Sequence, residues 1–181
     1  MDFQCFAFIA ASLDGFIARE DGDLSWLEDE TLKITGEDYG YQDFFDSIDT
    51  IVVGRCTYEI ASKFSEWPYA NKRVVVLSHA PLSLLAGPSK RMESANLRPG
   101  ELVSYLKTTG SQKVYVDGGK TIQSFLEAGF IDEITLTLIP ILLGRGISLF
   151  TTLSKETKLD LVHQKTYKNG YVQVCYRLQR G

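Results

Sequence analysis

Cysteine and histidine are scarce in this 181-residue sequence, which has three cysteines and two histidines. Cys5, Cys56 and Cys175 are odd in number, widely spaced, and unaccompanied by a CxxC pair or a Cys/His cluster. This pattern argues against a disulfide framework and against a zinc site, so we expect no metal. The three thiols are interpreted as reduced packing residues, in preference to a catalytic thiol.

Long apolar runs and an excess of positive charge are also missing. The apolar run 3–11 is too short to span a bilayer, and Met1-Asp2 lacks the basic start of a secretory signal. The formal net charge of −4 argues against sequence-independent binding of nucleic acid, which depends on clustered Lys and Arg. We therefore expect a cytoplasmic protein that binds neither membrane nor nucleic acid.

The sequence does contain a regular alternation of strands and helices. Its length suits a single domain over residues 1–181. Apolar runs rich in β-branched residues predict strands at 3–10, 50–53, 73–77 and 113–116, with helices at 101–109 and 121–128. This alternation predicts parallel strands joined by right-handed crossovers, with 3–10 as a central strand covered on both faces. The proline-containing stretch 80–99 is expected to be a surface loop.

The last third of the chain predicts antiparallel pairing. Residues 133–139 alternate in the manner of a strand, and Asn169-Gly170 supplies a hairpin turn between strands at 158–167 and 171–179. The expected fold class is therefore α/β, with a mixed, mostly parallel sheet flanked by helices and a C-terminal antiparallel hairpin. Ligands in such sheets bind at the carboxyl ends of the parallel strands. An edge strand of the hairpin, with Tyr171, Val174 and Tyr176, is a candidate for pairing in a homodimer.

Two strand ends carry features that suit a phosphate. After the strand 50–53 come Gly54, Arg55 and Thr57, which combine a close-approach glycine, a guanidinium and the free amides of a helix start. After the strand 113–116, Gly118-Gly119 allows backbone amides to approach a pyrophosphate, and Thr121 is positioned to cap the next helix. The alternative in each case is an ordinary strand–helix turn. Neither stretch matches a Rossmann fingerprint or a P-loop.

A third strand end, after residues 73–77, carries a hydroxyl and an imidazole. Ser78 and His79 suit an adenosine 2′-phosphate, and no acidic residue stands there to oppose a preference for NADPH. The alternative is a simple loop start. The three features together favour an extended dinucleotide site along one edge of the sheet.

The order of five motifs resembles the dihydrofolate reductase-like proteins, and above all the reductase half of the bifunctional riboflavin-biosynthesis deaminase/reductase. The resemblance covers nearly the whole chain and rests on the stretches AASLDGFIA at 10–18, VGRCTYE at 53–59, VLS at 76–78, VDGGKT at 116–121 and PILLGRG at 140–146. It implies a three-layer fold, with NADPH lying across the strand ends and a substrate opposite the nicotinamide.

Carried over by position, the resemblance assigns cofactor roles to eleven residues. It implies that Ala11 and Ile17 flank the nicotinamide, that Gly54, Arg55 and Thr57 lie at one phosphate region, that Leu77 and Ser78 contact the adenosine end, and that Gly118, Gly119, Lys120 and Thr121 hold the pyrophosphate. Asp14 shapes the loop over the cofactor, for which a plain turn is the alternative.

The same resemblance suggests where the substrate and its proton donor lie. Trp26 resembles the tryptophan that follows the mobile loop, and Arg145, between two glycines, is placed to meet an anionic substrate group. A carboxyl is the usual proton relay in folate reductases, and Asp38 and Asp43 are the candidates here. A solvated carboxylate at a helix start is the alternative for both.

These features predict an NADPH-dependent reductase of a small heterocyclic or carbonyl/imine substrate. The sequence has no fused deaminase signature of the HxE and PCxxC type, which favours a substrate other than that of the bifunctional protein. Dihydrofolate reduction is the alternative within enzymes. A nucleotide-binding module without turnover is the alternative from another class.

Overall fold

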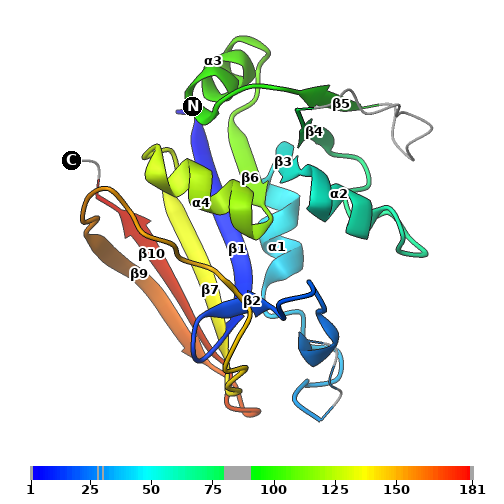
Figure 1. The fold of residues 1–181 in the computed structure, drawn as a ribbon, viewed down its shortest axis with the longest axis vertical. Helices are drawn as coiled ribbons and strands as arrows, with labels where there is room; N and C mark the ends of the chain where they lie inside the picture. The colour runs from blue at the N-terminus through cyan, green and yellow to red at the C-terminus, as the bar shows by residue number, and fades with distance from the viewer. Residues whose placement is uncertain (1, 28, 30, 80–90, 180–181) are drawn as a thin grey trace.

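A mixed eight-stranded sheet organises the molecule (Figure 1), which a computed structural model describes at residues 2–27, 29, 31–79 and 91–179. The strand order is β5-β4-β3-β6-β1-β7-β10-β9. The strands are β1 (Gln4–Ser12), β3 (Thr50–Gly54), β4 (Arg73–Leu77), β5 (Met92–Ala95), β6 (Lys113–Asp117), β7 (Glu133–Ile139), β9 (Leu159–Thr166) and β10 (Val172–Leu178). The first six in this order are parallel, and β10 and β9 add antiparallel pairs. The predicted mixed, mostly parallel sheet with a C-terminal hairpin is confirmed.

Alternation along the strands divides the core into two layers. On β3, Val52 packs into one apolar cluster, whereas Ile51 and Val53 pack into the other, and all three are fully buried. The first cluster includes side chains of α3 (Pro99–Thr108) and α4 (Gly119–Glu127). The second includes side chains of α1 (Tyr41–Ser47) and α2 (Arg55–Ala61). Helices therefore cover both faces, and the expected three-layer arrangement is confirmed.

One expectation for the middle of the chain needs correction. Residues 80–99 are expected to be a surface loop, but residues 92–95 form β5 and α3 begins at Pro99, while residues 80–90 lie outside the described part. The strand MESA lacks the apolar run that marks β3 and β4, and among the described residues it lies at the edge of the sheet, paired with β4. Polar contacts fix it instead, since Glu93 accepts hydrogen bonds from Arg73 at 2.6 Å and from Tyr105 at 2.6 Å.

The C-terminal hairpin also needs one correction. The sequence places Val174 and Tyr176 on an edge strand, but they belong to β10, which lies between β7 and β9. The free edge is β9, at the far side of the sheet from β5 (Figure 1). Alternation identifies both strands of a hairpin without telling which one pairs with the rest of the sheet.

Three short elements that the sequence does not predict lie near the carboxyl end of β1. They are β2 (Phe16–Ala18), β8 (Ile147–Ser148), which pairs with β2 in a separate two-stranded sheet, and the 3-10 helix η1 (Ser25–Leu27). Within the described ranges, no helix has the length and apolar character that crossing a membrane requires.

Candidate active site

The carboxyl ends of the parallel strands bring distant motifs to one edge of the sheet. Because β3 pairs with both β4 and β6, their last residues Gly54, Leu77 and Asp117 are near neighbours. Each is followed directly by one of the motifs identified from the sequence. The expected convergence on one sheet edge is therefore present in the fold.

The β3–α2 and β6–α4 junctions interlock through two glycines and two threonines. A Cβ atom placed on Gly118 would lie 2.2 Å from Oγ1 of Thr57, and one placed on Gly54 would lie 2.8 Å from Oγ1 of Thr121. Gly118 also has φ +91°, in the left-handed region that side chains disfavour. Glycine is thus required at position 118 by its backbone conformation and by the close approach of Thr57 from the β3–α2 junction.

Helix α4 begins at this junction without a side-chain cap from its N-cap residue. Its N-cap is Gly118, no side chain caps it, and the first backbone bond of the helix runs from the amide of Ile122 to the carbonyl of Gly118. The amides of Gly119, Lys120 and Thr121 precede that bond, and an anion is favoured at such a helix start.

Thr121 does not act as the helix cap that the sequence suggests. The helix starts two residues earlier than expected, and the Thr121 side chain is buried against Gly54. Lys120 remains exposed beside it. The Gly-Gly pair explains the earlier start of the helix. Gly118 serves as the N-cap through its backbone conformation, in place of the Thr121 side chain that the sequence suggests.

Ile17 and Ala11 lie on the other side of the same helix start. A Cβ atom on Gly119 would lie 2.2 Å from Cδ1 of Ile17, so this side chain covers the first turn of α4. Ala11 is only 1% exposed and belongs to the core cluster that includes α4. Of the two residues expected to flank a nicotinamide, Ile17 has the more accessible side chain.

Arg55 and Ser78 end the neighbouring strands with polar groups. The Arg55 guanidinium donates to Glu59 at 2.7 Å, an exposed pair that raises the pKa of Arg55. The amide of Ser78 donates to the carbonyl of Ala95, and His79 shares a 3.0 Å hydrogen bond with Asn96. These groups form a polar border beyond β3 and β4 in which Arg55 and His79 are exposed and Ser78 is half-buried.

Asp117 is a carboxyl group to which sequence reasoning assigned no role. Tyr69 donates a hydrogen bond to its Oδ2 atom at 2.6 Å, and the amide of Gly118 donates to Oδ1 at 2.7 Å. Desolvation by burial raises the pKa of Asp117, with the bonds from Tyr69, Gly118 and Tyr115 acting in the opposite direction. The residue as a whole is half-buried at the end of β6.

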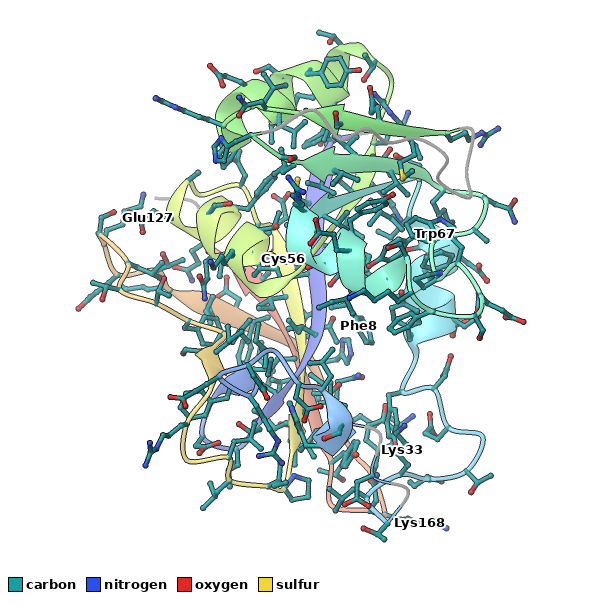
Figure 2. All side chains as sticks on the ribbon, turned by 45° about the vertical axis from the view of Figure 1, so that its right-hand side comes forward. Phe8, Lys33, Cys56, Trp67, Glu127 and Lys168 are labelled. Carbon is teal, nitrogen blue, oxygen red and sulfur yellow. The ribbon has the colours of Figure 1, made fainter. Side chains whose placement is uncertain are left out.

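Aromatic rings surround this carboxyl group. Tyr115 donates to the carbonyl of Phe8 at 3.0 Å, and burial together with the Asp117 charge raises the pKa of Tyr41, Tyr69 and Tyr115. In Figure 2, Phe8 and Trp67 lie on the side of the sheet covered by α1, in the apolar cluster that contains Tyr69. The three tyrosine hydroxyls therefore stay protonated at neutral pH. The one sequence signal for this group of residues is the stretch VDGG, in which an acidic residue precedes the two glycines.

The two carboxylates singled out from the sequence occupy a different place. Asp38 is exposed and its carboxylate accepts bonds from the amides of Gly40 and Gln42, which cap α1 and lower its pKa. Asp43 is exposed in the first turn of α1. Both match the helix-start alternative, and a catalytic role for either stays a prediction.

Trp26 is 3% exposed and packs near the ends of β1 and β7, against Ile139 and Tyr171. Its indole nitrogen is buried and finds no hydrogen-bond partner in the described part of the chain. A buried donor without a partner is costly, so this nitrogen marks a place where an acceptor would be stabilised.

The Asp14 carboxylate ties the loop after β1 to the loop after β7. It accepts hydrogen bonds from the Ser12 hydroxyl at 2.6 Å and from the amides of Leu143 and Gly144 at 3.2 and 2.7 Å. The Ser12 bond is the main reason that the pKa of Asp14 is lowered. Arg145 is the next residue after Gly144 in this loop. It lines a cavity of about 410 Å³ together with Arg19 and Leu143.

We expect Asp14→Ala to loosen the 140–146 loop without unfolding the protein. The amides of Leu143 and Gly144 should exchange hydrogen faster, as followed by exchange mass spectrometry. Because the Asp14 pKa is lowered, the tie holds above its usual value of 3.8 and is lost as the pH falls through the lowered value. Asp29→Ala is the matched control, since that exposed carboxylate accepts hydrogen bonds from the amide and hydroxyl of Thr31, within its own turn. Equal exchange in the two variants would contradict the assignment.

This chain is similar to several known proteins in sequence or in fold. The uncharacterized protein YwjB of Bacillus subtilis is 35% identical over 179 residues, covering 97% of this chain and 98% of its own. A Shewanella sp. PV-4 protein provisionally named for riboflavin biosynthesis is 32% identical, with a TM-score of 0.90 over 98% of this chain and 100% of its own. A dihydrofolate reductase from Enterococcus faecalis, solved with NADP(H), shares the fold with a TM-score of 0.63 at 16% identity, covering 99% of this chain and 100% of its own.

A family match then covers most of the chain. The family described as the RibD C-terminal domain matches residues 5–173, a span that contains the β3–α2 and β6–α4 junctions, Asp117 and the loop after β7. The chain belongs to the RibD C-terminal domain family.

Proposed function

We propose that this protein is an NADPH-dependent reductase that transfers a hydride to a small heterocyclic or carbonyl/imine substrate in the cytoplasm. The observation that carries the proposal is the interlock of two strand–helix junctions at one sheet edge, with the uncapped start of α4 between them. That arrangement presents backbone donors to an elongated anionic ligand. Membership in a reductase-domain family supports the same conclusion.

The residues present fit a dinucleotide with phosphates at its centre. The amides of Gly119, Lys120 and Thr121 would hold the pyrophosphate, with the Lys120 ammonium nearby. Ile17, over the first turn of α4, would contact the nicotinamide. Arg55 would lie at a phosphate region, and Ser78 would meet the adenosine end. The Enterococcus faecalis reductase described with NADP(H) has this fold, which supports the choice of cofactor.

When bound, the reduced nicotinamide supplies the hydride, and the protein supplies geometry and a proton. We assign the proton to Asp117. Its desolvation favours the neutral acid, and the Tyr69 hydroxyl orients the carboxyl group through a 2.6 Å bond. A neutral carboxyl at this edge can donate to a nitrogen or oxygen of the substrate as the hydride arrives on carbon.

Dihydrofolate reduction is a second candidate, because a carboxyl group in contact with aromatic rings suits protonation of a flat heterocycle. Turnover of dihydrofolate in a substrate panel would distinguish it from the first candidate. A nucleotide-binding module without turnover is the candidate from another class. Saturable NADPH binding without NADPH oxidation across the panel would support the module.

A fluorescence titration tests the cofactor assignment directly. We expect NADPH to quench protein fluorescence with a Kd in roughly the micromolar range, and Arg55→Ala and Ser78→Ala each to weaken NADPH binding about tenfold with smaller effects on NADH. Arg73→Ala is the matched control, because Arg73 pairs with Glu93 at 2.6 Å as Arg55 pairs with Glu59, but at the amino end of β4. Absence of binding by either nucleotide would overturn the assignment.

A further inference from the structure

Trp67 reaches the Asp117 carboxyl group through one intermediate ring. It packs edge-on against Tyr69, with ring centroids 5.2 Å apart and an interplanar angle of 88°, and the Tyr69 hydroxyl donates to Oδ2 of Asp117. The indole nitrogen of Trp67 is buried and finds no hydrogen-bond partner among residues 2–27, 29, 31–79 and 91–179. A hydrogen bond therefore does not fix the Trp67 ring, and its aromatic contacts do.

The second aromatic contact of Trp67 leads back to the same carboxyl group. Tyr58 on α2 packs against Trp67 with ring centroids 6.0 Å apart and an interplanar angle of 71°. The residue before Tyr58 is Thr57, which lies against Gly118, and the amide of Gly118 donates to Oδ1 of Asp117. The contacts form a closed circuit that holds both carboxyl oxygens, one from each side.

The two hydrogen bonds of Asp117 determine which oxygen carries the proton when the acid is neutral. A backbone amide can only donate, so Oδ1 accepts from Gly118 and is best satisfied as the carbonyl oxygen. A tyrosine hydroxyl can donate or accept, so Oδ2 is the oxygen that can carry the proton beside Tyr69. The hydroxyl next to the proton thus belongs to the ring against which Trp67 packs.

Tyrosine hydroxyls are the titratable groups that act on this carboxyl. Tyr69 comes from the α2–β4 connection, Tyr115 from β6 and Tyr41 from α1, and all three are protonated at neutral pH because burial raises their pKa values. Desolvation raises the pKa of Asp117, and the hydrogen bond from Tyr69 is the largest of the contributions that lower it. The position of the Tyr69 hydroxyl therefore controls the proton affinity of Asp117.

We infer that Trp67 is a positioning residue for proton transfer from Asp117, and that it acts by holding Tyr69 in place. This role rests on the proposed reductase function, in which Asp117 supplies the proton. The O–H bond at Oδ2 breaks as the proton forms a bond to a nitrogen or oxygen of the substrate. Tyr69 then donates to the carboxylate that remains, and a hydrogen bond to an ionised carboxylate is stronger than one to a neutral acid. A Tyr69 ring that is already in place lowers the barrier, because it does not have to reorganise as the charge develops.

A titration of the free protein tests the positioning without cofactor or substrate. In protein labelled at the aspartate carboxyl carbons, the NMR resonance of Asp117 is the one that Asp117→Asn removes. Tyr69→Phe should raise the pKa of Asp117, because the lost hydrogen bond lowers it. Trp67→Leu keeps an apolar side chain but removes the ring that holds Tyr69, so it should raise the pKa in the same direction. The double variant should match Tyr69→Phe alone.

Three further variants separate positioning from general damage. Trp67→Phe retains a ring and should restore the wild-type titration of Asp117. Tyr58→Leu removes the other contact of Trp67 and should shift the titration in the direction of Trp67→Leu, which provides the test if Trp67→Leu does not fold. Trp26→Leu is the matched control, because Trp26 is the other buried indole without a hydrogen-bond partner in the described ranges, and it packs near the ends of β1 and β7. It should leave the titration of Asp117 unchanged.

Kinetics with the best substrate of the panel give the second readout. Trp67→Leu should lower kcat roughly tenfold with KM within about twofold, and should add nothing to the loss caused by Tyr69→Phe. A wild-type titration of Asp117 in both Trp67→Leu and Tyr58→Leu, or effects of Trp67→Leu and Tyr69→Phe that add, would overturn the role of Trp67. Absence of NADPH oxidation by the wild type would overturn the reductase function and the transfer step with it, while the titration would still show whether Trp67 positions Asp117.

Discussion

Replacing Gly118 with alanine is expected to destabilise the protein by about 3 kcal/mol and to weaken NADPH binding by at least roughly tenfold. The backbone at 118 has φ +91°, and the added Cβ would meet Thr57 Oγ1 at 2.2 Å and Thr57 Cβ at 3.2 Å. To relieve this clash, the β3–α2 and β6–α4 junctions must move apart, and that movement displaces the amides at the start of α4. Urea unfolding measures the first effect, and fluorescence titration with NADPH measures the second.

Gly129→Ala is the control that isolates the steric part of this effect. Gly129 has φ +71°, but a Cβ there meets no atom within 4 Å, so only the backbone strain of about 1 kcal/mol applies. Adding Thr57→Ala to Gly118→Ala removes the hydroxyl and should recover part of the loss in a double-mutant cycle. Additive effects of Thr57→Ala and Gly118→Ala would show that the junctions are not coupled.

Replacing Asp117 with asparagine is expected to lower kcat by about 10² to 10⁴ while leaving NADPH affinity within about twofold. Asparagine keeps the shape of the side chain and one acceptor oxygen, which can hold the bond from either Tyr69 or the Gly118 amide, but it cannot release a proton. The measurement is steady-state NADPH oxidation with the best substrate of the panel. An unchanged kcat would remove Asp117 from the mechanism, whereas the loss of NADPH binding would indicate structural damage instead.

The pH dependence of the same variant provides a second measurement that needs no substrate. Because burial raises the pKa of Asp117, its contribution to folding is most favourable below its usual 3.8 and is lost as the pH rises through the raised value. Asparagine does not titrate, so the stability of Asp117→Asn relative to wild type should increase with pH. In a separate activity assay with substrate, wild-type activity should fall as the pH rises through the raised pKa of Asp117. The Asp117→Asn variant should not show this fall.

The parts of the fold predicted from sequence are those encoded by local pattern. Positions 50–53 and 74–76 are buried on both faces of the sheet and are all filled by β-branched residues, so these strands are readily predicted. Strand β5 pairs on one side only and holds its place through Glu93, a long-range contact that no local pattern contains. The identity of the edge strand likewise depends on which hairpin strand meets β7.

The candidate site shows the same division. Gly54, Gly118 and Gly119 could be predicted as contact points because glycine at a strand end is a local signal of close approach. What each glycine approaches is a side chain of another junction or loop, namely Thr121, Thr57 or Ile17, and only the fold brings these together. The sequence does not single out Asp117 for the same reason, since its surroundings come from Tyr69 and Tyr115 and not from its neighbours in sequence.

The interlock of the two junctions also bears on how the protein acquires its binding competence. The segments that carry Thr57 and Gly118 are joined by a long stretch of chain that includes β4, β5 and α3, so their contact closes a large loop and has a high entropic cost. A chain still emerging from the ribosome has β3 and α2 but not α4. Affinity for the dinucleotide should therefore arise late and cooperatively in folding, and a ligand that binds only the finished junction would act on this protein as a pharmacological chaperone.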